Sequence, residues 1–335
     1  MNIVFDLTTL WAAVIAFAVF MYVVMDGFDL GIGMLLPVLD NGEERDQALN
    51  SVAPVWDGNE TWLVLGGGGL FAAFPLAYAI VMPATYPLII AMLLGLVFRG
   101  TGFEFRWRDP AHRRFWDFAI TAGSLVAALS QGIILGALIQ GVKVSGRAYA
   151  GGWTDWLSPY SLLTGLGTVV GYVLLGACWL AIKTEGKAEV HGYRFARLAT
   201  FATGALMVGV SAATPFLFPE YYQRWFASPL IWFVAPVPVL TGIAFLTLLN
   251  ALAAQRPWRA FLCALGIFAL GMIGLGVSMY PHIVPPSLTI WDAAAPRRSQ
   301  EFMIVGVALI LPLILGYTGW AYWVFRGKVG TDGYH

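Results

Sequence analysis

The stretch LWAAVIAFAVFMYVVMDGFDLGIGMLL, residues 10–36, decides the fold class of this chain. It exceeds the roughly 20 apolar residues that a helix needs to cross a bilayer. A segment in hydrocarbon must be helical, because its backbone polar groups have no water with which to bond. Asp26 and Asp29 interrupt this apolar run. A carboxylate at such a depth is costly unless it is paired or protonated, so both residues are candidates for function.

The rest of the chain has the same apolar character. Of its 335 residues, 59% are hydrophobic and 11% are charged, whereas soluble domains have about 25% charged residues. The formal net charge is zero, which gives no electrostatic reason to expect a nucleic-acid partner. We predict an all-α polytopic membrane protein in which residues 1–335 form a single integral membrane domain. Its nine predicted spans are residues 10–36, 52–74, 78–98, 118–139, 162–182, 198–218, 230–252, 261–280 and 302–324.

The basic residues predict the orientation of these spans. With the N-terminus outside, 14 of the 19 Lys and Arg residues lie at the inner connections and five lie outside. The inner set includes Arg99 and Arg106, placed by this count in the connection after the third span. Because cytoplasmic loops carry an excess of Lys and Arg, we expect an outside N-terminus and a cytoplasmic C-terminus.

Acidic residues within the apolar runs are confined to the first two predicted spans. Asp26 and Asp29 are three residues apart, as are Asp57 and Glu60, so each pair is expected on one helix face. Since the two spans are consecutive and antiparallel, both pairs are expected near the cytoplasmic side, where they could begin a proton path. The alternative is structural. Asp26 or Asp57 could instead pair with a helix-end arginine such as Arg99, or cap a helix.

Histidine and cysteine give no sign of a metal site. The four histidines lie in loops, in the tail or at a helix end: His112, His191, His282 and His335. No predicted span has a central histidine that could ligate iron, so we expect no heme in this chain. Cys178 and Cys263 are isolated from each other and from any Cys-x-x-Cys pattern, which predicts small buried thiols.

Four sequence motifs are similar to those of a known family. They are MDGFDLGIGML at 25–35, APVWDGNETWLV at 53–64, FRGTGFEFR at 98–106 and MYPHIVPPSLTIWDA at 279–293. Together, and in this order, they resemble subunit II of the cytochrome bd-type quinol oxidases. The resemblance covers nearly all nine predicted spans. The short chain is similar to the branch described as cyanide-insensitive.

The resemblance implies a bacterial inner-membrane heterodimer that oxidises quinol and reduces oxygen to water. The other subunit, subunit I, would carry two hemes b, one heme d and most of the quinol site. This chain would carry no heme and no directly catalytic residue, support assembly and contribute to proton uptake from the cytoplasm. A small accessory subunit and a bound quinone or lipid remain open. Family members also suggest two four-helix bundles plus one peripheral helix.

The resemblance carries residue roles onto matching positions. Asp26 and Asp29 match the acids of the GFD motif, and Asp57 matches the acid of the WDGN motif. Glu60 stands where some relatives have a neutral polar residue. These four residues form the expected proton pathway. The charged residues of FRGTGFEFR are expected to act as structural, helix-end partners: Arg99, Glu104 and Arg106.

Two other classes of function compete with this interpretation. A proton-coupled secondary transporter would also keep intramembrane acids, but such folds place broken helices at corresponding positions of two halves. The fifth predicted span, LLTGLGTVVGYVLLGACW, has no acidic counterpart to the first. A purely structural membrane subunit remains the second alternative if the acids form only ion pairs.

Overall fold

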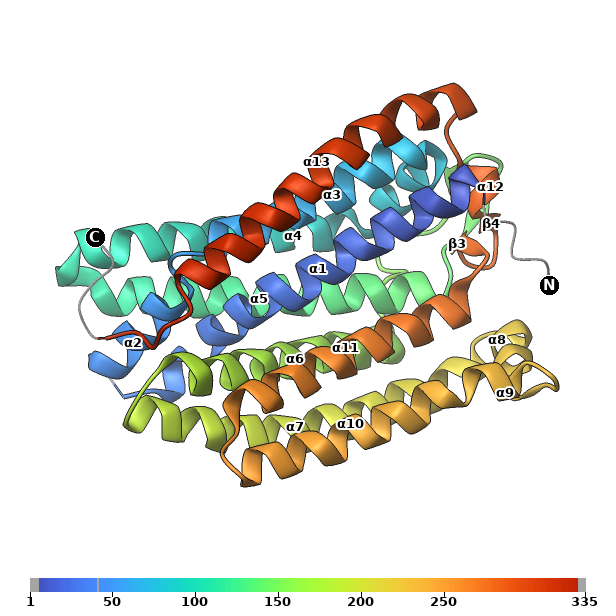
Figure 1. The fold of residues 1–335 in the computed structure, drawn as a ribbon. Coiled ribbons are helices and arrows are strands. Elements are labelled where there is room, and N and C mark those ends of the chain that lie inside the picture. The colour runs from blue at the N-terminus through green and yellow to red at the C-terminus, as the bar shows by residue number, and fades with distance from the viewer. Residues whose placement is uncertain (1–5, 41, 331–335) are drawn as a thin grey trace.

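The computed structural model describes residues 6–40 and 42–330, which form a bundle of long helices with two short hairpins (Figure 1). Within these ranges, eight helices are long and apolar enough to cross a membrane. They are α1 (Leu7–Leu35), α4 (Pro75–Arg108), α5 (Arg113–Ile139), α6 (Pro159–Lys183), α7 (Lys187–Ala213), α10 (Pro236–Ala253), α11 (Pro257–Met279) and α13 (Arg297–Val324). Each overlaps one predicted span.

The remaining elements are short. The 3-10 helices are η1 (Leu36–Val38), η2 (Pro110–His112) and η3 (Thr214–Phe216). The short α-helices are α2 (Glu43–Val52), α8 (Pro219–Phe226), α9 (Ile231–Val234) and α12 (Ile290–Ala293). Strands β1 (Val144–Ser145) and β2 (Ala148–Tyr149) pair antiparallel, as do β3 (His282–Val284) and β4 (Leu288–Thr289).

The predicted span over residues 52–74 corresponds to α3 (Trp56–Ala73). This helix has 18 residues and is not among the eight, because Asp57, Asn59 and Glu60 lower the hydropathy of its first turns. Polar residues in a membrane helix require a neighbour that satisfies them. The predicted number of nine spans is therefore not confirmed by length and composition.

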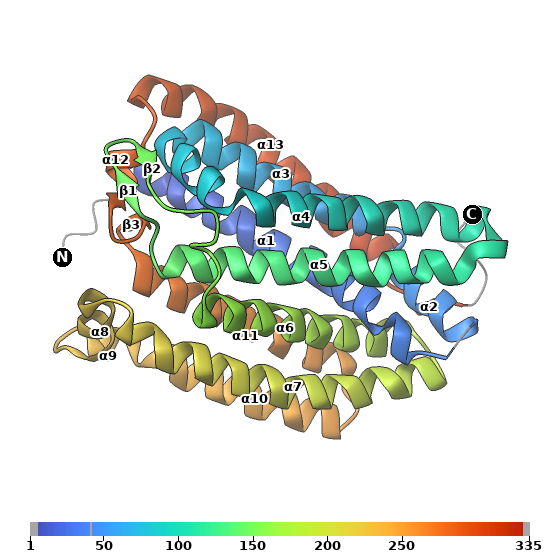
Figure 2. The same ribbon diagram turned by 180° about the vertical axis from the view of Figure 1, so that it is seen from behind.

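The long helices pack as two groups with one helix outside them. In Figures 1 and 2, α6, α7, α10 and α11 form one group, and α1, α3, α4 and α5 form the other. Helix α1 joins the groups, because it contacts α3, α5 and α6. Helix α13 crosses the outer side of α3 and α1, and only Gln300 of its residues is buried. Helix α13 thus covers α1 and α3, the two helices that carry the predicted proton-pathway acids.

Close contact between helices depends on glycine at several crossings, including those of α1 with α6 and of α4 with α5. A Cβ at Gly31 of α1 would lie 2.0 Å from the carbonyl oxygen of Tyr172 on α6. A Cβ at Gly123 of α5 would lie 2.3 Å from the carbonyl oxygen of Gly95 on α4. Small residues let membrane helices approach to backbone contact. The glycines beside Asp29 therefore bring α1 against α6 and bury that segment of α1.

Helix α4 corrects one prediction. The sequence places Arg99 and Arg106 in a connection after residue 98, but the helix continues to Arg108 and both side chains are buried. At 34 residues, α4 is about 51 Å long, well beyond the hydrocarbon thickness. Counting apolar residues ends a span at the first charge. The ion pairs described below allow the helix to continue past that point.

Candidate functional site

Arg99 of α4 contacts carboxylates from two other helices. Its Nη1 lies 2.5 Å from Asp26 Oδ1 of α1, and its Nη2 lies 2.8 Å from Glu60 Oε2 of α3. The Asp26 and Arg99 side chains have no solvent exposure, and the Glu60 side chain is 30% exposed. One guanidinium therefore ties α1, α3 and α4 together at a buried point.

A second set of contacts adjoins the first. Asn59 Nδ2 donates a hydrogen bond to Asp29 Oδ2 at 2.7 Å, and the Tyr322 hydroxyl donates to Asn59 Oδ1 at 2.8 Å. Asp29 and Asn59 are buried. Tyr322 comes from α13, so the outer helix reaches the polar interior. We call these six residues the acidic cluster: Asp26, Asp29, Asn59, Glu60, Arg99 and Tyr322.

The acidic cluster holds more acid than base. Two carboxyl groups, of Asp26 and Glu60, contact the single guanidinium, and the third, of Asp29, contacts an amide rather than a cation. Among the described residues, no donor bonds to Asp29 Oδ1, which is buried. Burying unmatched carboxylates is costly, and a bound proton removes both the charge and the lack of a donor. The excess of carboxyl groups over cations makes the acidic cluster the candidate site for proton exchange.

Aromatic and polar side chains enclose this cluster. The Arg99 guanidinium lies 5.6 Å from the centre of the Trp56 ring, which stacks on Phe103. On the other side, Gln131 Nε2 donates to the Tyr22 hydroxyl at 2.7 Å, and the Tyr172 hydroxyl donates to Gln131 Oε1 at 2.7 Å. Tyr22 is one helical turn before Asp26. A chain of hydroxyl and amide groups thus runs from α6 through α5 to α1.

The two acids of α3 have different surroundings. Glu60 points to Arg99, whereas Asp57 is exposed and has no hydrogen bond or ion pair with another described residue. The sequence predicts that they share a helix face. Three residues advance a helix by about 300°, so the two side chains diverge by about 60°. That divergence is enough to direct Glu60 inward to Arg99 and Asp57 outward to the surface.

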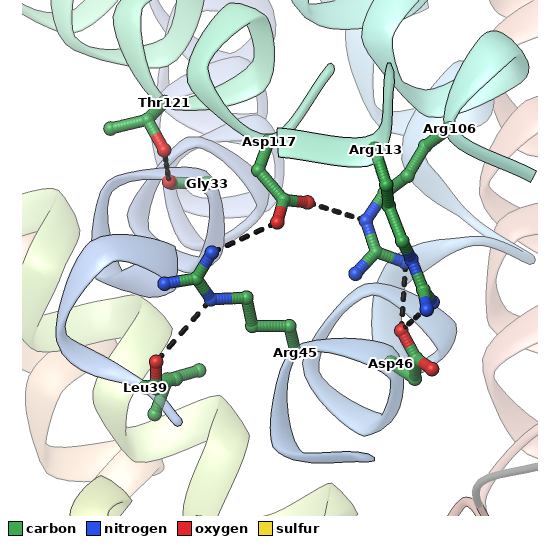
Figure 3. Close-up of polar contacts among 8 residues, drawn as sticks. All are labelled: Gly33, Leu39, Arg45, Asp46, Arg106, Arg113, Asp117 and Thr121. Carbon is green, nitrogen blue, oxygen red and sulfur yellow. Dashed lines mark hydrogen bonds and ion pairs between the residues drawn. The ribbon is translucent and has the colours of Figure 1, made fainter. Parts of the chain in front are cut away.

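Arg106 belongs to a separate ion-pair network, shown in Figure 3. Its Nε lies 2.5 Å from Asp117 Oδ1, and its Nη1 lies 2.7 Å from Asp46 Oδ1. Arg45 Nη1 lies 2.9 Å from Asp117 Oδ2, and Arg113 also contacts Asp46. Each carboxylate of this network contacts two guanidinium groups. The network fastens α2 to the ends of α4 and α5 and has no excess acid.

Glu104 lies outside both groups. It pairs with Arg108 at 3.4 Å, and the two side chains are 56% and 73% exposed. Exposed pairs of this kind contribute about 0–1 kcal/mol. The three charged residues of FRGTGFEFR therefore have three different surroundings: the acidic cluster, the ion-pair network and the surface.

The described histidines lie outside the middle of the apolar helices. His112 of η2 contacts Asp109, and His191 in the first turns of α7 contacts Glu44 of α2. His282 lies in β3. His335 lies outside the described residues. Cys178 and Cys263 are free thiols; Cys178 is buried as predicted, whereas Cys263 is part exposed. In residues 6–40 and 42–330, no three His, Cys, Asp or Glu side chains are placed to hold a metal ion.

The sequence matches the family described as Cytochrome bd terminal oxidase subunit II over residues 7–325. The chain belongs to this family. It is 31% identical to the cytochrome bd-I ubiquinol oxidase subunit 2 of Escherichia coli (strain K12), over 96% of this chain and 95% of that protein. It is 28% identical to the cytochrome bd ubiquinol oxidase subunit 2 of Bacillus subtilis (strain 168), over 97% of each chain.

A solved structure agrees with the fold. A chain of the bd oxidase from Geobacillus thermodenitrificans superposes with a TM-score of 0.74 at 20% identity, covering 96% of this chain and 99% of that one. The cytochrome bd subunit II chain is thus a component of a respiratory terminal oxidase, an oxidoreductase complex in which it works with subunit I. It is a multi-pass protein of the bacterial inner membrane. The predicted family and localisation are confirmed.

Proposed function

We propose that this chain is the heme-free subunit of a quinol-oxidising terminal oxidase and that it takes up protons from the cytoplasm for oxygen reduction. The reaction of the whole complex would be 2 QH2 + O2 → 2 Q + 2 H2O. Two relatives named as ubiquinol oxidases support the choice of electron donor. The positions of the described histidines support placing two hemes b and one heme d on subunit I. The cyanide-insensitive branch stays a prediction.

The observation that carries the proton-uptake proposal is the excess of acid in the acidic cluster. Water formation consumes protons inside a low-dielectric barrier, and titratable groups in a row lower that barrier. We place exposed Asp57 at the entrance, followed by part-exposed Glu60 and then by buried Asp26 and Asp29. If quinol releases its protons outside while these residues draw on the cytoplasm, turnover builds a proton-motive force.

The proposed topology has nine spans in one membrane domain of residues 1–335. Helix α3 would be the ninth span, because its polar side chains have partners inside the bundle: Glu60 contacts Arg99, and Asn59 bonds to Asp29. The two groups of helices described above would be two four-helix bundles, with α13 as the peripheral helix. The distribution of basic residues supports an outside N-terminus and a cytoplasmic C-terminus.

The outward face of α3 supports a subunit contact there. Asp57 and Thr61 are exposed on this face, and a Cβ at Gly58 or Gly68 would meet nothing within 4 Å. Carboxyl and hydroxyl groups are costly against lipid, and exposed glycines permit close helix contact. We propose that subunit I covers the part of this face from Thr61 to Gly68, that Asp57 at the start of α3 stays open as the proton entrance, and that assembly support acts through the covered part. A small accessory subunit and a bound quinone remain predictions.

The experiment that tests proton uptake is Asp29→Asn in the purified complex with subunit I. Asparagine keeps the acceptor for Asn59 but cannot bind and release a proton, and Asp29 contacts no cation whose loss would confuse the result. We expect an intact heme spectrum and a severalfold slower oxygen consumption with a reduced quinol. Glu104→Gln, at an exposed surface pair, is the matched control. Oxygen consumption at the parental rate in Asp29→Asn would refute the proposal.

A purely structural subunit is the second candidate, and the buried Asp26–Arg99 pair favours it. Loss of heme or of assembly in Asp29→Asn would support this alternative. The secondary transporter has no comparable support, because α1 runs without a break from Leu7 to Leu35.

A further inference from the structure

A cavity lies between the first turns of α7 and the connection from α10 to α11. Its volume is about 430 Å³, and it is lined by Val190, Tyr193, Arg194, Arg197, Leu198 and Gln255. Among the residues that the structure describes, no acidic side chain lines it. The cavity is separate from the acidic cluster and from the ion-pair network, since it shares no residue with either.

Two guanidinium groups in this cavity lack an anion. Arg194 and Arg197 are three residues apart on α7, so they lie on one helix face. Arg197 Nη2 donates to the carbonyl oxygen of Leu252 at 3.1 Å, which orients its side chain while leaving other donors available. Neither arginine forms an ion pair with any residue of the described ranges. A guanidinium group matches the geometry of a phosphate, which it can bind through two parallel hydrogen bonds, and Arg194 adds a second cation beside the oriented Arg197.

The depth of these arginines suits a headgroup. Helix α7 begins at Lys187, so Arg194 and Arg197 lie about 10 and 15 Å along it. Helical side chains lean toward the N-terminus of their helix, which in the proposed orientation is the cytoplasmic end. Long basic side chains at this depth extend to the polar boundary of the membrane. Both guanidinium groups are therefore expected at the level of lipid phosphates.

The same face of α7 becomes apolar beyond the arginines. Leu198, Phe201 and Val208 are 58%, 66% and 69% exposed. Their spacing of three and seven residues continues the face that begins with Arg194. A ligand that fits here has an anionic head and an apolar tail. A free phosphate would leave the apolar stripe unused, and a quinone head would leave both cations unmatched.

We propose that this cavity binds the headgroup phosphate of an anionic phospholipid from the cytoplasmic leaflet, with an acyl chain lying along Leu198 and Phe201. Basic pockets between membrane helices on the cytoplasmic side commonly hold such headgroups. The leaflet assignment rests on the proposed topology. The lipid site itself rests on the cavity, the two arginines and the apolar stripe.

The test measures lipid bound to the purified complex with subunit I by native mass spectrometry. Delipidated complex is titrated with phosphatidylglycerol, with phosphatidylcholine and with inorganic phosphate as a competitor. We expect one phosphatidylglycerol to bind about thirtyfold more weakly to Arg194→Gln/Arg197→Gln than to the parent. The Arg194→Lys/Arg197→Lys variant should recover part of the binding. Arg114→Gln, an exposed arginine on α5 with no ion pair to a described residue, should bind like the parent.

Three results would overturn the proposal. Equal binding of phosphatidylglycerol by the parent and the double glutamine variant removes the arginines from the site. Equal affinity for phosphatidylcholine removes the need for net negative charge. Displacement by inorganic phosphate at the same concentration as the lipid assigns the cavity to a free anion. Because bound lipid is counted in detergent without turnover, failure of the proton-uptake proposal leaves this readout unchanged.

Discussion

Arg99 Nη1 lies 2.5 Å from Asp26 Oδ1, and neither side chain has any exposure to solvent. The two residues are 73 positions apart, on α4 and α1. Removing one partner of a buried ion pair typically costs about 3–5 kcal/mol, since the other charge is left unmatched. Asp26 therefore has a structural role whatever its part in proton transfer, and substitutions at Asp26 must be interpreted with that role in mind.

A double-mutant cycle measures this pair. We expect Asp26→Asn and Arg99→Gln each to lower the thermal stability of the assembled complex, by an amount corresponding to about 3–5 kcal/mol. The variant with both changes should lose less than the sum, because each single change already removes the Asp26–Arg99 interaction, while the loss of Glu60's partner occurs in both variants that lack Arg99. Heme release on heating of the purified complex is the measurement. Strictly additive losses would show that the two side chains do not interact.

Glu60→Gln should lower oxygen consumption by the complex, although some relatives have a neutral polar residue at this position. Glu60 Oε2 contacts the Arg99 guanidinium at 2.8 Å and its side chain is part exposed, so it can connect bulk water to the buried acids. We expect an assembled complex with a normal heme spectrum and a severalfold lower oxygen consumption. Glu104→Gln again serves as the control. Parental turnover in Glu60→Gln would restrict the path to Asp26, Asp29 and Asp57.

Tyr322→Phe tests the contribution of α13 to the acidic cluster. The change removes the hydrogen bond to Asn59 Oδ1 and keeps the ring that packs against Phe28. An unsatisfied buried acceptor costs about 1–3 kcal/mol, so the complex should melt at a lower temperature. Tyr317→Phe is the matched control, because Tyr317 is on the same helix and 68% exposed. Identical melting of the two variants would contradict the role given to Tyr322.

A C-terminal reporter tests the topology. A fluorescent protein that folds only in the cytoplasm should give signal when fused after the last residue, because basic residues concentrate at that end of the spans. A periplasm-dependent phosphatase at the same position should be silent. The opposite pattern would refute both the proposed orientation and the leaflet of the lipid site.

The chain purified without subunit I should show no Soret absorption. None of the histidines in the described ranges lies in the middle of an apolar helix, where an axial ligand to a buried heme would be needed. The spectrum of the complex with subunit I provides the positive control. Stoichiometric heme in the isolated chain would make His282 a candidate ligand, and His282→Ala should then abolish the absorption.

The sequence by itself determined the class of protein, the approximate positions of its spans and the first helix as the one that carries Asp26 and Asp29 inside an apolar run. Runs of about 20 apolar residues have few structural solutions in a bilayer, so hydropathy is informative about each segment. Spacing along α1 also indicated that Asp26 and Asp29 share a face. The four motifs in order were enough to predict the family, which the comparisons confirmed.

Only the tertiary structure decided which side chains meet the acids. Asn59 and Tyr322 are 263 residues apart, and no local pattern relates α13 to α3. The same holds for Arg99, which hydropathy placed in a connection and which packing buries on α4 between Asp26 and Glu60. A helical period fixes the face on which a residue lies, but the neighbour on that face depends on how the helices pack. Buried charges are tolerated only when such neighbours match them.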